Sequence, residues 1–382
     1  MPILLNRLIS LTAQYGYTVA LNIILAKISV NSVLFLWCAK IVGSLLSLPA
    51  NRQLNRIQNK KTLLISLEIA KAGIFGVMPL LFRHWLLFGL VLLVEIISDV
   101  FDGNLTAFVP KVVERENLSR FDASITSVGS ISYFVGPLLV GVLQGQPESL
   151  LFYIYGLVTF LGGLTLWLLP IVEFESNRRE TGLSLLKLDF VQAIRAILSV
   201  KGLAAICLVY LLLDNMGTGL DSFEIIFVTK IIGLTAAQYA FSLSFLAVVF
   251  LIVSAALAFW RIGLRSQTVF QIGAVIYIGY AVVMLISRQF GILLVSYTLL
   301  AIGLTLMGNM VDNLIQINID DENRSQVFIL ESMLTNILSA VTVFVLGILQ
   351  NTGLGINLAY WGLVGLTVMV VSIIEIVNRQ RT

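Results

Sequence analysis

The stretch LLVEIISDVFDGNLTAFVP, residues 92–110, decides how this chain folds, because it places acids inside an apolar run. Glu95, Asp99 and Asp102 follow one another in it at steps of four and then three residues. At about 100° per residue, these steps return each side chain to nearly the same face of a helix. A helix over this stretch therefore carries an acidic stripe along one side.

The composition of the whole chain shows which solvent surrounds that helix. Of 382 residues, 58% are hydrophobic and 12% are charged, and the mean hydropathy is +0.97. A soluble domain carries about 25% charged residues. Because lipid offers no partner for backbone N–H and C=O groups, apolar segments that cross it must be helices. We therefore predict an all-α membrane protein.

Apolar stretches of about 20 residues, each long enough to cross a bilayer as a helix, recur along the chain. The first has no small-residue cleavage site, so we interpret it as a helix and not as a signal peptide. The twelve predicted spans are 5–26, 32–50, 62–82, 86–109, 123–144, 150–172, 203–229, 238–260, 267–287, 290–316, 326–349 and 357–377.

Basic residues indicate which side of the membrane each loop faces. Most of the 24 Lys and Arg residues fall in alternate loops, among them 52–61, 111–120 and 178–201. Basic loops favour the cytoplasmic side, so we predict a multi-pass inner-membrane protein with both termini in the cytoplasm. This rule accounts for the basic loops without a nucleic-acid partner.

The sequence lacks the clustered residues that metal binding or thiol chemistry would need. Cys38 and Cys207 fall inside spans as isolated small hydrophobes, and His84, the only histidine, lies in an outer loop. We predict no disulfide, no metal site and no cofactor. Any proton relay within the membrane has to use carboxylates.

The chain contains an internal repeat. The segment GNLTAFVPKVVERENLS (103–119) resembles GNMVDNLIQINIDDENRS (308–325), and LLVGVLQ (138–144) resembles FVLGILQ (344–350) at nearly the same offset. Each repeat unit holds six spans, an even number, so both copies enter the membrane in the same direction. Parallel repeats of this kind are the signature of one large transporter architecture.

The repeat divides the chain into three parts. We predict a six-helix bundle over 1–172, a cytoplasmic linker over 173–202 and a second six-helix bundle over 203–382. In the linker, apolar residues such as Phe190 and Ile194 share one helical face. This pattern predicts either an amphipathic helix on the inner membrane surface or a partly ordered linker.

Over its whole length the chain resembles the major facilitator superfamily, and residues 101–143 are similar to the fourth-to-fifth helix region of its macrolide-efflux and enterobactin-exporter branch. The resemblance implies twelve transmembrane helices in two pseudo-symmetric six-helix bundles, with spans 1, 4, 7 and 10 lining a central cavity. The positions that carry it are Ala107 and Pro110 at a helix end, the pair Asp122 and Ala123, and the pair Gly136 and Pro137.

The superfamily's loop signature, Gly-x-x-x-Asp-Arg-x-Gly-Arg-Arg, is kept only in part between the second and third spans. There the sequence reads NRQLNRIQNKK (51–61), which keeps the charges at Arg56, Lys60 and Lys61 but has Asn51 in place of the glycine. The loop still resembles a cytoplasmic latch, although its match to the signature is degenerate.

Charges inside spans are the strongest functional candidates, because a charge in hydrocarbon costs a few kcal/mol or more. Glu95 and Lys40 lie at similar depths in their spans, so Glu95 either forms an ion pair or binds a proton. Asp99 has no evident partner, and we expect it to couple protons or contact a cationic group. Glu68 and Lys71, three residues apart, are predicted to satisfy each other.

In the second half, Asp214 and Asp221 lie one heptad apart, with Gly217 and Gly219 between them. Glycines weaken a helix, and transporters place binding sites in broken helices. We therefore predict a broken helix here, with Asp214 either at a cavity site or packed as a polar residue against another helix. The polar residues predicted to contact the cavity or to form interhelical hydrogen bonds are Gln14, Asn22 and Asn309.

The resemblance also implies a cytoplasmic gate. In the fold that it implies, an acid of the fourth span, here Asp102, pairs with the arginine of the loop signature, Arg56. Asp312, near the inner end of the tenth span, is expected to play the matching part with Arg265 or Arg261.

These residues favour a secondary active transporter, a monomer that binds a small molecule, protons and membrane lipid. We predict a proton-coupled exporter of a drug or siderophore, an antiporter; export follows from the resemblance. An importer of a nutrient or metal chelate on the same fold is the alternative. An intramembrane enzyme lacks a nucleophile–base pair, and a receptor or scaffold that has lost transport remains a further alternative. No phosphate-binding Gly-x-x-x-x-Gly-Lys-[Ser/Thr] motif is present to use ATP.

Overall fold

The helices of a computed structural model match the predicted spans closely where the chain is described. Within the described residues, nine helices are long and apolar enough to cross a membrane. The acidic fourth span is also one continuous helix, α4 (Leu86–Val112). The described residues are 2–54, 57, 59–114, 118–170, 192–200, 202–259, 266–351, 360–362 and 365.

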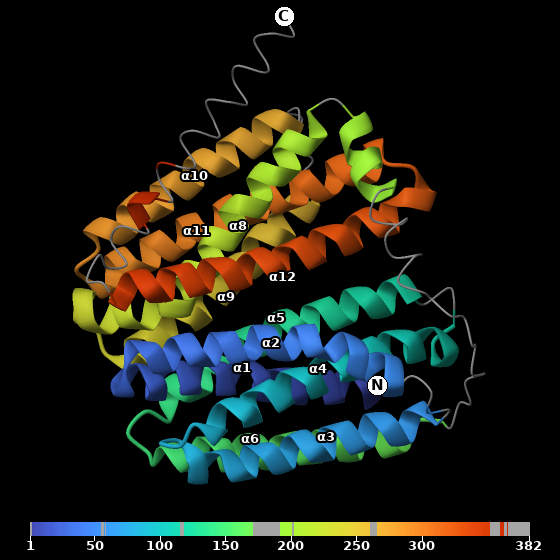
Figure 1. Ribbon diagram of the computed structural model, residues 1–382, viewed down its shortest axis with the longest axis vertical. Coiled ribbons are helices and arrows are strands. Elements are labelled where there is room, and N and C mark those ends of the chain that lie inside the picture. Colours follow the sequence, from blue (N-terminus) through green and yellow to red (C-terminus); the bar gives the residue numbers. More distant parts are fainter. Residues whose placement is uncertain are drawn as a thin grey trace, which may run out of the picture. The chain divides into compact units, whose positions relative to one another are not determined.

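The first compact unit comprises Met1–Arg178 together with Thr235–Val248. In it α1 packs against α5 and α6, α2 packs against α4, and α3 packs against α6 (Figure 1). Its complete helices are α1 (Pro2–Ile28), α2 (Val30–Leu54), α3 (Lys60–Val77), α4 (Leu86–Val112), α5 (Leu118–Val142) and α6 (Glu148–Thr165).

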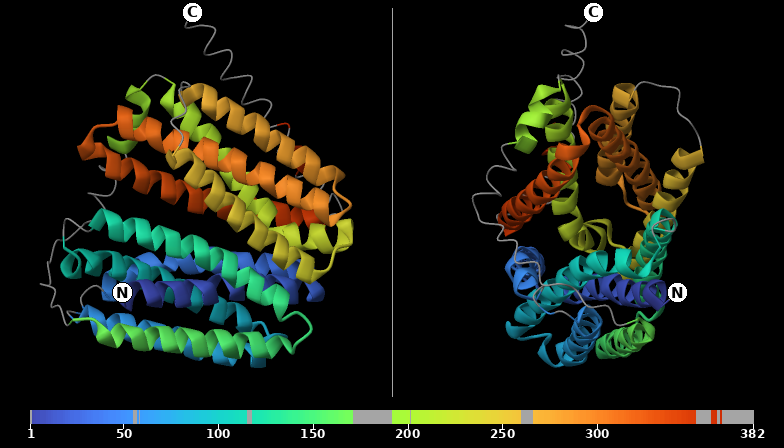
Figure 2. Two further views of the ribbon diagram at one scale, coloured as in Figure 1. Left: turned by 180° about the vertical axis from the view of Figure 1, so that it is seen from behind. Right: turned by 90° about the vertical axis from the view of Figure 1, so that its right-hand side faces the viewer.

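The second compact unit comprises Arg179–Leu234 and Val249–Thr382. In it α10 and α11 form a long antiparallel pair, and α8 packs against both α11 and α12 (Figure 2). Its helices are α8 (Leu203–Ile226), the π-helical turn η4 (Phe227–Ile232), the end of α9 (Ala236–Phe259), α10 (Ser266–Ile286), α11 (Phe290–Asn318) and α12 (Asp321–Asn351).

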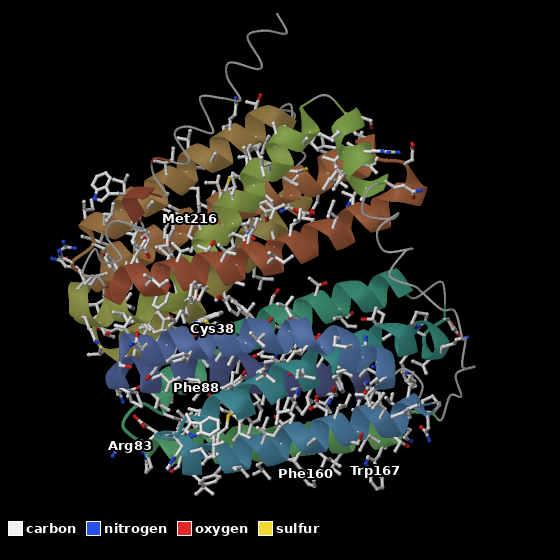
Figure 3. The ribbon with its side chains drawn as sticks, in the orientation of Figure 1. Cys38, Arg83, Phe88, Phe160, Trp167 and Met216 are labelled. Atoms are coloured by element: carbon white, nitrogen blue, oxygen red, sulfur yellow. The ribbon has the colours of Figure 1, made fainter. Side chains whose placement is uncertain are left out.

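The outer face of α6 shows that the bundle is built for lipid. Tyr153, Leu157, Phe160 and Leu164 are exposed at steps of three or four residues, so they form one apolar stripe. Figure 3 shows Phe160 pointing away from the helices. The opposite face carries small and aromatic side chains that are buried against α1 and α3. An exposed apolar face of this length needs hydrocarbon around it.

The predicted break in the seventh span is wrong. α8 runs as an unbroken α-helix through Gly217 and Gly219. A Cβ added at Gly217 would lie 2.6 Å from the Tyr277 hydroxyl, and one at Gly219 would lie 2.5 Å from the Thr342 methyl. The glycines therefore permit close packing of neighbouring helices, which is their usual role between membrane helices.

Several predictions fall wholly or partly outside the described residues. These are Arg56, Arg261, Arg265, most of the linker and most of the twelfth span. Of the linker, residues 192–199 are helical. The proposed boundaries between the three parts stay predictions.

Candidate functional site

The three acids of α4 share a face but occupy three environments. Glu95 is 8% exposed. Asp99 is half-buried, and the side chain of Asp102 is 47% exposed. Exposure of the acidic stripe thus increases from the bundle interior towards the predicted cytoplasmic end, and the three carboxylates differ in their surroundings.

Glu95 is the most tightly held of the three. The Lys40 ammonium lies 3.1 Å from Glu95 Oε1, and the Tyr17 hydroxyl donates to the same oxygen at 2.6 Å. Lys40 also donates to Thr18 Oγ1 at 2.9 Å. Of the two interpretations left open by the sequence, the ion pair is present. A charged pair with additional hydrogen bonds is the arrangement that a buried carboxylate requires.

Aromatic rings enclose Lys40. Its Nζ lies 5.5 Å from the centroid of the Tyr17 ring and 5.4 Å from that of Trp37. Both distances allow cation–π attraction. Trp37 donates in turn to Asn22 Oδ1 at 3.2 Å. We call this set the Glu95 site; it consists of Tyr17, Thr18 and Asn22 from α1, Trp37 and Lys40 from α2, and Glu95 from α4.

Gly43 lets α2 and α4 meet at the Glu95 site. A Cβ at this position would lie 2.7 Å from the Leu92 carbonyl oxygen and 2.9 Å from Glu95 Cβ. Real side chains do not approach so closely, so only glycine fits without movement of a helix. The backbone contact brings Lys40, one turn earlier on α2, within reach of Glu95.

Asp99 sits one turn along α4 from Glu95 and lacks a comparable partner. The hydroxyls of Ser44 and Ser47 face its carboxylate. No ion pair joins Asp99 to a residue within the described part of the chain. Asp99 is therefore the α4 carboxylate with no basic partner among the described residues.

Asp102 pairs with the guanidinium of Arg7 from α1. Arg56, the predicted partner, lies outside the described residues. Arg7 also lies over the Phe101 ring, with its guanidinium carbon 5.9 Å from the ring centroid. The sequence does not single out Arg7 as this partner, because nothing in the spacing links the start of the first span to the fourth.

A second set of polar side chains forms hydrogen bonds with the same end of α4. Lys60 donates to Asn104 Oδ1 at 2.8 Å, and Asn104 Nδ2 donates to Asn51 Oδ1 at 2.9 Å. Asn51 and Lys60 belong to the degenerate loop signature. The repeat offered a signal for Asn104, because its counterpart Asn309 makes the same bond to the carbonyl four residues earlier, at 2.8 Å in both halves.

Glu68 and Lys71 satisfy each other, as predicted. Their charged atoms lie 2.9 Å apart and are almost fully buried. Ser10 donates to Glu68 at 3.0 Å and accepts from Lys71 at 2.7 Å. This arrangement joins α1 to α3, and it leaves the buried Glu68 Oε2 without a hydrogen-bond partner among the described residues.

In the second unit, Asp214 and Asp312 lie close enough that both act electrostatically on Tyr210 and Glu331. Asp214 is half-buried, whereas Asp221 and Asp312 are exposed. Asn309 is exposed and bonds to its own helix. Gln14, in the first unit, takes part through its backbone carbonyl, which accepts from Thr18 at 3.0 Å. Within the described residues, Asp214 and Asp312 therefore share a neighbourhood, whereas these hydrogen bonds of Asn309 and Gln14 stay within their own helices.

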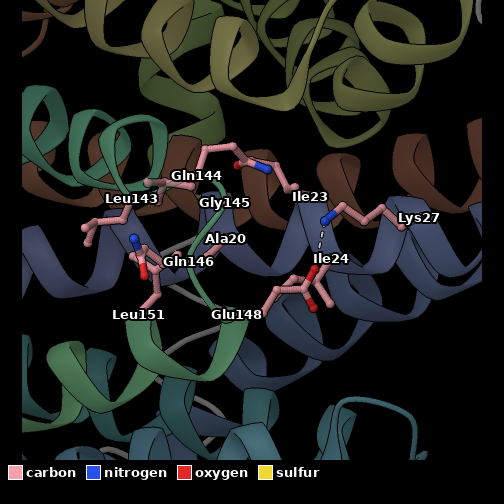
Figure 4. A pocket seen from close by; sticks show the side chains of 11 residues that line it. Ala20, Ile23, Ile24, Lys27, Leu143, Gln144, Gly145, Gln146, Glu148 and Leu151 are labelled. Atoms are coloured by element: carbon pink, nitrogen blue, oxygen red, sulfur yellow. Dashed lines mark hydrogen bonds and ion pairs between the residues drawn. The ribbon is translucent and has the colours of Figure 1, made fainter.

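A small pocket opens at the opposite end of the first unit from Asp102. Its volume is about 130 Å³, and the ion pair of Lys27 and Glu148, 2.7 Å long, lies at its edge (Figure 4). Sites for drug-sized ligands measure about 300–1,000 Å³. This pocket is therefore too small for such a ligand.

Comparison with known proteins identifies the fold. A sequence model of the Major Facilitator Superfamily matches residues 3–343. The chain belongs to this superfamily. Membership of this superfamily identifies the chain as a membrane transporter and not an enzyme. No curated protein sequence matches it.

Solved structures agree with the superfamily fold. A mutant of the nucleoside transporter NupG has a TM-score of 0.80 at 10% identity, with 98% of each chain covered. The POT family transporter PepTSo has a TM-score of 0.74 at 10% identity, covering 99% of this chain and 97% of its own. The human organic anion transporter MFSD10 has a TM-score of 0.68 at 13% identity, with 98% of each covered. Such low identities establish the fold alone.

Proposed function

We propose that this Major Facilitator Superfamily transporter is a proton-coupled exporter of a small amphipathic molecule, a drug or a siderophore, in the inner membrane. It would work by alternating access, with protons entering as substrate leaves. The resemblance of residues 101–143 to the macrolide-efflux and enterobactin-exporter branch supports export.

One observation carries the proposal: Glu95 is held by Lys40, while Asp99, one turn away, faces hydroxyls and no cation among the described residues. An unpaired carboxylate within a membrane bundle is costly unless it binds a proton or a cation. Asp99 can therefore hold one of the two at a time. Competition between proton and cationic substrate for one carboxylate produces exchange, because each releases the other.

Protonation of Glu95 would give the first unit a second state in the same transport cycle. A proton on Glu95 removes its charge and frees the Lys40 ammonium from its partner. Since Tyr17, Lys40 and Glu95 come from α1, α2 and α4, loss of the ion pair weakens the link between three helices at once. Protonation at this level is thus coupled to the packing of the first unit.

The test uses proteoliposomes with an imposed pH gradient and two radiolabelled probes, a macrolide and enterobactin. Wild-type protein should move at least one probe against its concentration gradient. Asp99→Asn, which is neutral and of equal size, should lose gradient-driven accumulation at least tenfold. Gradient-driven accumulation that is unchanged in Asp99→Asn would remove Asp99 from the coupling mechanism.

The alternative function is import of a nutrient or metal chelate. The same vesicles separate the two, because a symporter accumulates its substrate in the direction of proton flow, whereas an antiporter accumulates it in the opposite direction. Accumulation of the probe down the proton gradient, in the direction of proton flow, would identify symport and overturn export.

A further inference from the structure

A third carboxylate of α8, which the spacing of the glycines and aspartates does not single out, lies in the interior of the second unit. Glu224 is 2% exposed, and its Oε1 has no hydrogen-bond partner among the described residues. It follows Asp221 by three residues, so the two side chains are neighbours on one helical face. Asp221 is exposed. The pair thus joins an accessible carboxyl to an enclosed one.

Tyrosines surround Glu224 from the other helices. The rings of Tyr277 and Tyr280 lie 5.5 Å apart, and those of Tyr280 and Tyr360 lie 6.2 Å apart. The hydroxyls of Tyr280 and Tyr360 are buried and have no hydrogen-bond partner in the part of the chain that the structure describes. The titratable groups that face Glu224 are Asp221 from α8, Tyr277 and Tyr280 from α10, Tyr297 from α11, and Tyr360.

These groups that face Glu224 are acids and phenols, and none of them is a cation. The described residues also hold no ion pair that includes Glu224. An anionic carboxylate that is 2% exposed inside a membrane bundle, with no cation facing it among the described residues, is costly. A neutral carboxyl suits the same surroundings, because it can donate to one tyrosine oxygen and accept from another.

We propose that α8 carries a second proton-binding site, in which exposed Asp221 passes a proton to buried Glu224. The ligand is a proton alone, because side chains that are almost fully buried leave no entry for a larger cation. The transfer moves one proton from the Asp221 carboxyl to the Glu224 carboxylate, and no other bond changes. Glu224 lies 21 residues after Leu203, about 32 Å along the helix, towards the end predicted to face away from the cytoplasm.

Proton binding at Glu224 is independent of the proposed export through Asp99, although its use in transport depends on that function. In a coupled cycle it would add a second proton to the one taken by the first unit. α8 would then resemble α4, because each helix carries an enclosed glutamate, Glu224 or Glu95, together with more accessible aspartates.

The experiment measures the infrared band of protonated carboxyl groups in purified protein reconstituted in lipid, with no substrate and no gradient. At neutral pH, Glu224→Gln should lose one carboxyl C=O band that wild-type protein shows. Ser222→Ala is the matched control, because Ser222 is equally buried on the same helix and bonds to the Thr218 carbonyl. Its spectrum should keep the band.

Tyr280→Phe keeps the experiment informative where Glu224→Gln fails to fold. Removal of that hydroxyl should shift the band without abolishing it, since the ring and its packing remain. Asp221→Asn should slow the loss of the band at least tenfold after a jump to alkaline pH. A band that is unchanged in both Glu224→Gln and Tyr280→Phe overturns the site, whereas failure of Asp99→Asn to affect transport leaves this readout untouched.

Discussion

Lys40 and Glu95 form an ion pair that is nearly closed to solvent. The exposed fractions of their side chains are 16% and 10%. The pair of Lys27 and Glu148, in the same unit, has fractions of 54% and 43%. A charge left without its partner in a low-dielectric interior is far more costly than one at a surface. The two pairs therefore provide a direct comparison at the scale of single residues.

We expect Lys40→Gln to destabilise the protein by about 3–5 kcal/mol, because it leaves Glu95 buried and charged. Lys27→Gln, the control, should cost less than about 1 kcal/mol, because its partner is solvated. The double variant Lys40→Gln/Glu95→Gln should recover most of the lost stability. The measurement is equilibrium unfolding in detergent micelles. Equal losses from Lys40→Gln and Lys27→Gln would contradict the buried pair.

At the scale of helices, α2 and α4 approach each other through a glycine and not through interdigitated large side chains. Gly43 brings the two backbones into contact beside Glu95. Gly73, on the exposed side of α3, would place an added Cβ in open space, with no described atom of a neighbouring segment within 4 Å. A side chain at Gly43 would thus collide with a neighbouring helix, whereas one at Gly73 would meet open space.

We expect Gly43→Ala to destabilise the first unit by about 1–3 kcal/mol, because the added methyl group forces the two helices apart. Gly73→Ala should be neutral or should stabilise by up to about 1 kcal/mol, because alanine is the better helix former. Thermal unfolding of the two purified variants compares them. A loss in Gly73→Ala as large as that in Gly43→Ala would show that close approach of α2 and α4 does not set the cost at Gly43.

At the scale of the whole molecule, membrane orientation follows from the placement of basic residues. The prediction sets the loop that holds Arg83 outside and the loop that holds Asp320 inside. Both residues are exposed. Cys38 and Cys207 are the only cysteines, and both lie within helices, so a cysteine-free background requires two substitutions.

In that background, we expect a membrane-impermeant maleimide to label Arg83→Cys in intact cells and Asp320→Cys only after the membrane is opened. The physical reason is the retention of basic loops on the cytoplasmic side. The readout is the mass shift of the labelled protein on a gel. Labelling of Asp320→Cys in intact cells would reverse the predicted topology.

Hydropathy and spacing alone determined the helices, the repeat and the superfamily resemblance, because these depend on local composition and on residues close in sequence. They also determined the pairing of Glu68 with Lys71, which are neighbours on one helix. The same reasoning failed at Gly217 and Gly219, because a glycine that breaks a helix and one that admits a neighbouring helix look alike in sequence.

Tertiary structure decided which partner each buried charge has. Arg7 reaches Asp102, Tyr17 reaches Glu95, and Asn104 joins the two ends of the loop signature. Each of these contacts connects helices that are far apart along the chain, and a partner of this kind follows from helix packing and not from spacing. The environment of Glu224 was likewise decided only by folding, because burial among tyrosines of three other segments leaves no periodic trace in the sequence around it.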